Sequence, residues 1–165
     1  MPKLKPLEHW ICDTCSEAIL EPNHGYVEWR SGYGTGEGAH SFRIVHHAPR
    51  SPRYAKGGTC YQFNDALDQS TLELPHFLGP HGVVLLLSLV DVGLHHDPNR
   101  KERPAKDLRE WANVFRRLQL PYYEEARRYW SRATNEGYFE DLNEIAIYQS
   151  ARMRKMIEYY ERDDS

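Results

Sequence analysis

The sequence predicts an α+β fold, with a small β module at residues 1–60 followed by a helical region at residues 61–165. Short stretches of the first part alternate between apolar and polar residues, as strands with one buried face do. After about residue 61 the apolar residues instead recur at the three- and four-residue spacing of helices. The chain has 165 residues, of which 40% are hydrophobic, and this fits about one domain, so we expect the two parts to pack as one unit.

The β module is expected to contain three short strands joined by loops. Trp10 and Ile11 lead into a Cys-Asp-Thr-Cys turn, residues 26–30 alternate with a period of two, and residues 39–47 alternate again. Residues 31–38 contain four glycines, and residues 48–59 contain two prolines and a Gly-Gly pair. Both of these segments are therefore predicted to be loops.

Three to four helices are expected in the second part. Pro104 is predicted to open one helix at its first position, where a helix has no use for the N–H that proline lacks. Pro121 is predicted to end that helix and to open the next one. The polar segment at 93–103 is predicted to be an exposed linker. The four predicted helices are 83–92, 104–120, 122–134 and 142–160.

Composition limits the classes of function that need to be considered. The net charge of −3 argues against a generic binder of polyanions, and residues 61–99 carry no Lys or Arg but five Asp or Glu. The first ten residues contain no apolar stretch of signal-peptide type, and no apolar run approaches the roughly 20 residues that span a bilayer. We therefore expect a cytoplasmic protein. In that compartment the three cysteines are better explained as metal ligands or free thiols than as a disulfide framework.

One set of residues carries recognisable chemistry. Cys12 and Cys15 flank a two-residue turn, which lets both thiolates point at one ion about 2.3 Å away. Such a pair needs two further ligands to close a tetrahedron. His46 at the end of a predicted strand and Cys60 at the end of a predicted loop supply them. The resulting Cys3His set is a standard composition for a structural zinc site, so we expect one zinc ion per chain.

Two neighbouring histidines compete for the single histidine position. Strand alternation places His46 on the same face as Phe42 and Ile44, which should be the inward face, so His46 is preferred. A one-residue bulge would transfer the role to His47. In either case four protein ligands leave no position for a reactive water. Residues 10–60 contain few large aliphatic side chains, so zinc binding would supply folding free energy that this segment lacks.

The run from Trp10 to Cys15 followed by a strand resembles the first knuckle of zinc-ribbon and zinc-knuckle modules. The resemblance covers about ten residues and implies that Cys12 and Cys15 bind zinc. It implies nothing about a substrate. Ser16 stands where these modules usually carry glycine, and the usual second Cys-x2-Cys pair is absent.

Two alternative functions use other residues. His46 or His47, followed by Asn64 and His76, invites comparison with ββα-metal (HNH-type) nucleases, although Asn64 and His76 are farther apart than that pattern prefers. A nucleic-acid-binding module is the other alternative, because arginines alternate with aromatic residues on both sides of Pro121. Nearby glutamates can neutralise those arginines, which favours a structural role for them.

The sequence therefore favours a zinc-binding adaptor or regulatory protein that acts through protein–protein contacts. Tyr, Trp and Arg on the predicted helices are the residue types from which interface anchors are usually made. No serine, cysteine or paired-carboxylate arrangement of a known catalytic type follows from the spacing, so catalysis is not expected. A protein partner is expected, and the oligomeric state stays open.

Overall fold

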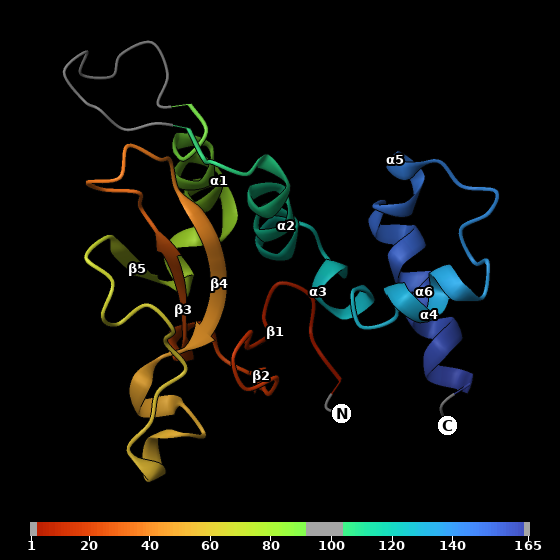
Figure 1. Cartoon of the computed structure of the whole chain (residues 1–165). Coiled ribbons are helices and arrows are strands. Elements are labelled where there is room, and N and C mark those ends of the chain that lie inside the picture. The colour runs from red at the N-terminus through yellow and green to blue at the C-terminus, as the bar shows by residue number, and fades with distance from the viewer. Residues whose placement is uncertain (1–2, 92–103, 164–165) are drawn as a thin grey trace.

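The computed structural model describes residues 3–91 and 104–163, and the predicted linker at 93–103 lies outside them. The described part is an α+β structure, as predicted, with small antiparallel sheets in the first half and helices in the second (Figure 1). Its strands are β1 (Trp10–Ile11), β2 (Ala18–Ile19), β3 (Gly25–Arg30), β4 (His40–His46) and β5 (Gln69–Glu73). Its α-helices are α1 (Gly79–Ser88), α2 (Leu108–Gln119), α3 (Tyr123–Ala126), α4 (Trp130–Asn135), α5 (Glu144–Ile147) and α6 (Ser150–Asp163). Its short 3₁₀ helices are η1 (Pro22–His24), η2 (Ala48–Arg50), η3 (Tyr54–Lys56) and η4 (Leu74–Phe77).

The main sheet has three antiparallel strands in the order β4-β3-β5. The central strand β3 pairs on both edges, so that Tyr26 lies opposite Val45 on one side and opposite Glu73 on the other. Strands β1 and β2 form a separate two-stranded ribbon in which Trp10 lies opposite Ile19. Both of these side chains are fully buried, so the ribbon contributes directly to the core.

Strand β5 is a difference from the sequence prediction, which expected helical structure from about residue 61. Among its five residues only Leu72 is a large aliphatic, so the segment has no period-two pattern to reveal it. Contacts outside the strand hold it in place instead. The carbonyl oxygen of Asp68 accepts a hydrogen bond from the Ser31 amide at 2.8 Å, and its side chain pairs with Arg30. The division into units at residue 60 stays a prediction.

The first two helices begin at different residues from those expected. Helix α1 starts at Gly79 and not at residue 83, and Gly82 on it is buried against the backbone of Phe77. Helix α2 starts at Leu108 and not at Pro104, because Asp107 caps it by accepting hydrogen bonds from the amides of the second and third helical residues. Capping chemistry therefore overrides the preference of proline for the first turn.

The two later helices are each divided in two. The predicted helix at 122–134 becomes α3 and α4, because the backbone between them makes short-range bonds such as that from the Tyr129 amide to the Ala126 carbonyl. The predicted helix at 142–160 becomes α5 and α6, and Asn143 caps the shorter one through the Ala146 amide at 2.8 Å. The second half therefore contains more helices than the hydrophobic periodicity predicted. The four helices into which these two predictions divide are shorter than the predicted ones.

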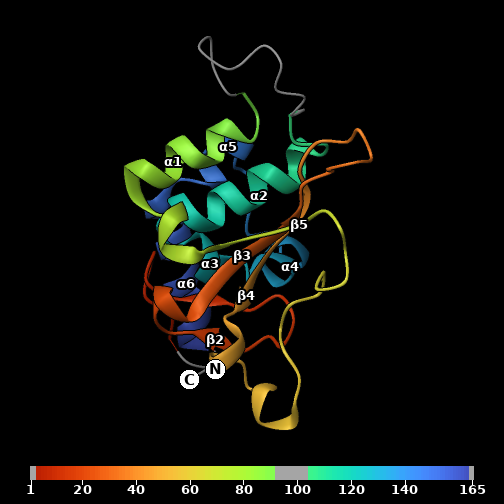
Figure 2. The same cartoon turned by 90° about the vertical axis from the view of Figure 1, so that its left-hand side faces the viewer.

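The buried side chains form two hydrophobic clusters. The first joins the sheet, the β1–β2 ribbon, α1 and α2, and it includes Cys12 and Cys60. The second lies among α3, α4 and α6 and is largely aromatic, with Tyr123 and Tyr160 among its buried members. In Figure 2, α1 and α2 lie side by side over the sheet, and the Trp111 indole donates to the Leu86 carbonyl at 2.8 Å between them.

A buried ion cluster connects the two halves of the chain. The guanidinium of Arg117 on α2 is almost fully buried, and it donates to both carboxylate oxygens of Glu124 at 2.8 Å. The same group donates to the Asp13 carboxylate at 2.6 Å and to the Ile11 carbonyl at 2.9 Å. Burial favours the neutral form of Glu124, but the charge of Arg117 outweighs it and lowers the pKa of Glu124. These contacts fasten the cysteine turn at 12–15 to α2 and α3.

None of the helices within the described ranges is long and apolar enough to cross a membrane.

The ion cluster makes a direct prediction for stability. Arg117→Met removes the main partner of the buried Glu124 carboxylate and of the partly exposed Asp13 carboxylate. Among the described residues only Arg127 still pairs with these two groups, so the free energy of unfolding should fall by about 3 kcal/mol. Arg154→Met is the matched control, since Arg154 pairs with Glu158 on the exposed face of α6 and should change stability by less than about 0.5 kcal/mol. Urea unfolding followed by circular dichroism measures both. If both substitutions change the free energy of unfolding equally, the buried ion cluster does not stabilise the contact between the cysteine turn and the helices.

Candidate functional site: a cysteine–histidine cluster

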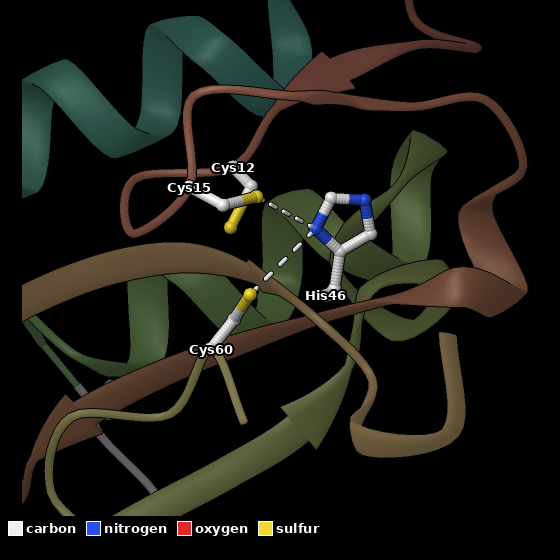
Figure 3. Close-up of side chains that lie close together, drawn as sticks. All are labelled: Cys12, Cys15, His46 and Cys60. Carbon is white, nitrogen blue, oxygen red and sulfur yellow. Dashed lines mark hydrogen bonds between the residues drawn. The ribbon is translucent and has the colours of Figure 1, made fainter. Parts of the chain in front are cut away.

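The Cys12–Cys15 turn connects β1 to β2 and brings two sulfur atoms to one side of the ribbon (Figure 3). The turn is closed by hydrogen bonds from the Cys12 amide to the Glu17 carbonyl at 2.9 Å and from the Ser16 amide to the Cys12 carbonyl at 3.0 Å. To reverse direction in so few residues, Ser16 adopts a left-handed conformation with φ of 62°. This is the position at which zinc knuckles usually carry glycine.

The structure brings His46 and Cys60 to the same place from two other segments. His46 is the last residue of β4, and Cys60 follows the loop that contains η2 and η3. The ligand atoms of Cys12, Cys15, His46 and Cys60 all lie within 4.8 Å of one another, and we refer to these residues as the Cys3His cluster. Cys15 is partly exposed and the other three are buried. The cluster can hold one metal ion.

The geometry within the cluster fits a tetrahedral ion. Nδ1 of His46 lies 3.4 Å from the Cys15 sulfur and 3.9 Å from the Cys60 sulfur, as the dashed lines in Figure 3 show. Bond lengths of about 2.3 Å to sulfur and 2.0–2.1 Å to nitrogen give a tetrahedron whose nitrogen–sulfur edges are about 3.6 Å. The two observed separations lie on either side of this value. The four side chains therefore need only small movements to bind an ion.

A hydrogen bond orients the His46 ring for this role. Its Nε2–H donates to the carbonyl oxygen of Ala18 at 3.3 Å, which leaves Nδ1 facing the sulfur atoms. The neighbouring His47 is not in the cluster. Its ring packs against Tyr26 with 4.9 Å between the ring centroids. Of the two histidines that the sequence left open, the structure thus places His46 among the cysteines.

Charge explains why the cluster favours a cation. Burial raises the pKa of Cys15 to about 12 and also raises that of Cys60. Burial acts on Cys12 in the same sense, but the His46 imidazole and nearby backbone amides outweigh it and lower the pKa of Cys12 to about 6. One thiolate is therefore stable here and three are not. A divalent ion supplies the positive charge that offsets the cost of burying the other two cysteines as thiolates.

Second-layer hydrogen bonds hold the sulfur atoms in position. The Thr14 amide donates to the Cys12 sulfur at 3.4 Å, and the Ser51 hydroxyl lies 3.1 Å from the Cys60 sulfur. Sequence analysis missed Ser51, because nothing in a proline-containing loop marks its partner. It also missed that Asp13, inside the cysteine turn, pairs with Arg117. The signal for that pair was the position of Arg117 three residues after the buried Val114, on the same face of α2.

The residues of the nuclease alternative lie apart from any such arrangement. Asn64 donates from its side-chain amide to the Thr59 hydroxyl at 3.4 Å, and His76 is exposed in η4. Among residues 3–91 and 104–163, the Cys3His cluster is the one group of three or more Cys, His, Asp or Glu side chains with ligand atoms this close. Nuclease activity gains no support and stays a prediction.

The arginines that alternate with aromatic residues are engaged within the protein. Arg127 lies 3.3 Å from a Glu124 oxygen, Arg132 lies 2.9 Å from a Glu136 oxygen, and the guanidinium of Arg116 lies 4.3 Å from the ring centroid of Tyr148. The aromatic side chains of this region belong to the second hydrophobic cluster. This agrees with a structural role for these residues.

Comparisons with protein-family models, with curated proteins and with solved structures found no match to this chain. The resemblance to zinc-ribbon modules therefore rests on the Cys12–Cys15 turn alone.

The left-handed turn residue yields a second prediction. A non-glycine residue in this conformation costs about 1–2 kcal/mol, and glycine removes that strain while it increases the entropy of the unfolded chain. Ser16→Gly is therefore expected to raise stability by up to about 1 kcal/mol, and the β-branched Ser16→Val should lower it by more than about 1 kcal/mol. Thermal unfolding of the two variants beside the unaltered chain measures the order. If Ser16→Gly unfolds at a lower temperature than Ser16→Val, the left-handed conformation of this residue is contradicted.

Proposed function

We propose that this chain is a zinc-binding adaptor or regulatory protein, in which one structural zinc ion is held by Cys12, Cys15, His46 and Cys60. The observation that carries the zinc assignment is the convergence of these four ligand atoms within 4.8 Å. Three soft sulfur donors and one imidazole in a near-tetrahedral arrangement are the donor set that zinc prefers over magnesium, calcium or manganese.

The closed donor set supports a structural role for the ion. Four protein ligands complete the coordination of zinc, so no position is left at which a bound water could be activated. The ion would link the β1–β2 turn, the end of β4 and the loop before Cys60. Structural zinc supplies about 10 kcal/mol or more of folding free energy in comparable small modules.

The outward face of α1 supports a role in protein–protein contacts. Val84 and Leu87 are 66% and 48% exposed, and α1 carries no Asp, Glu, Lys or Arg. A helix that is apolar on every side is normally buried, so this face has the character of a contact surface. The aromatic residues of the later helices, from which the sequence analysis argued for partners, are mostly in the second hydrophobic cluster. Helix α1 is therefore the better candidate surface.

Metal analysis tests the zinc proposal. The purified chain should hold one zinc per chain, and both His46→Ala and Cys60→Ser should lower the zinc affinity by at least about tenfold, since each removes a ligand. His47→Ala is the matched control and should leave the affinity unchanged. A strong chelator should unfold the β module, because about 10 kcal/mol is comparable with the whole stability of a typical domain. A chain that keeps its near-ultraviolet circular dichroism without bound metal contradicts the proposal, as does equal zinc loss in both histidine variants.

Site-specific cross-linking tests the contact surface. A photoreactive residue at position 87 should cross-link a discrete protein in cells, whereas the same residue at the exposed Lys155 on α6 should not. Val84→Lys places a charge in the apolar face and should abolish the cross-link at position 87. Identical cross-linking from both positions, or cross-linking that survives Val84→Lys, argues against a role for α1.

A further inference from the structure

A projection next to the Cys3His cluster carries an unusual concentration of positive charge. Residues 48–59, which we call the basic lobe, contain η2 and η3 and extend away from the sheet in both views (Figures 1 and 2). The chain has no Asp or Glu between Glu37 and Asp65. Within this stretch the lobe contributes three exposed cations: Arg50, Arg53 and Lys56. The protein as a whole is acidic, so this is a local feature and not a general one.

These cations are available to a ligand. In the part of the chain that the structure describes, none of the three lies in an ion pair with a carboxylate. Arg53 donates to the Thr14 carbonyl at 3.2 Å, which positions the side chain beside the cysteine turn without neutralising its charge. This contrasts with Arg117, Arg127 and Arg132, each of which pairs with a glutamate.

The lobe is held in one conformation. His46 precedes it and Cys60 follows it, and Ser51 within it bonds to the Cys60 sulfur at 3.1 Å. Backbone bonds between Tyr54 and Ser51 at 3.0 Å and between Gly58 and Arg53 at 3.0 Å close its two turns. A charged surface that is already ordered loses little entropy when it binds.

The basic lobe also carries an exposed aromatic residue. Tyr54 is 56% exposed and stands directly after Arg53. Cations alone suit any polyanion, but an exposed ring beside them is the combination that holds single-stranded nucleic acid, in which phosphates bind to cations and bases stack on rings. A folded acidic protein or a lipid headgroup offers the ring no base to stack on.

We propose that the basic lobe binds single-stranded nucleic acid, with Arg50, Arg53 and Lys56 on the phosphates and Tyr54 against a base. Such a site goes beyond the adaptor role and uses a different surface from α1. Three phosphate contacts give weak, salt-dependent binding with little preference for sequence. The net charge of −3 does not oppose this proposal, because the nucleic acid would contact only the positively charged basic lobe.

Fluorescence anisotropy with the full chain and a labelled oligothymidylate of about 12 nucleotides tests the proposal, at salt concentrations between about 25 and 200 mM. The double variant Arg50→Gln, Lys56→Gln should weaken binding at least about tenfold at low salt. It should also reduce the slope of log K against log salt by about 1.4, because each phosphate that a cation no longer neutralises lowers the slope by about 0.7. Tyr54→Ala should weaken binding about fivefold or more.

The matched control is Arg152→Gln, Lys155→Gln, which removes the same charge from the exposed face of α6 and should leave binding within about twofold. Circular dichroism confirms that the variants, all at exposed positions, stay folded. The proposal is overturned by an absence of binding at low salt or by equal losses in the two double variants. It is also overturned if Tyr54→Ala binds as the unaltered chain does, or if phosphatidylserine vesicles compete as well as unlabelled oligonucleotide.

Discussion

The guanidinium of Arg117 is the contact on which the arrangement of the molecule depends. It binds Asp13 from the cysteine turn and Glu124 from α3, while the Ile11 amide donates to the same glutamate at 2.9 Å. Asp13 also accepts a hydrogen bond from the Ile44 amide at 2.7 Å, so one carboxylate joins the turn both to β4 and to α2. The Trp10 indole adds a hydrogen bond to the Arg117 carbonyl at 3.1 Å, and Cys12 shares a hydrophobic cluster with Val114 and Leu118 of α2.

Joining two parts of a protein through a buried Arg117 and Glu124, with Asp13 partly buried beside them, carries a large desolvation cost. The desolvation of the ions offsets most of their attraction, and an apolar contact of the same size would often be as stable. A guanidinium with two carboxylates is, however, far more selective in geometry, because its planar N–H groups have fixed directions. The cluster thus fixes how the Cys12–Cys15 turn sits against α2. The same rigidity benefits the Cys3His cluster, whose first two ligands flank Asp13 in sequence.

The sequence predicted well what depends on local spacing. The two-residue interval of the cysteine turn and the alternation of β4 were enough to propose Cys12, Cys15 and His46, and the α+β class followed from a change in hydrophobic period. Strand β5 was missed because its place depends on pairing with β3 and on the Asp68 contacts, and not on its own residues. Neutralisation of the helix arginines by nearby glutamates was expected, and Arg117 does bind Glu124, but its second partner Asp13 lies 104 residues away and was missed. The helical spacing places Arg117 on the buried face of α2, but it does not indicate which distant residue would be its partner.

The order of the ligands along the chain has a consequence for biosynthesis. All four members of the Cys3His cluster have been translated once Cys60 has been added, more than 50 residues before Arg117 exists. Chains emerge from the ribosome N-terminal end first, and early segments can fold while later ones are still being made. The four side chains of the proposed zinc site are thus all available to an ion while the rest of the chain is still being made. The Asp13 carboxylate gains its ion-pair partner only later, when Arg117 of α2 has been added.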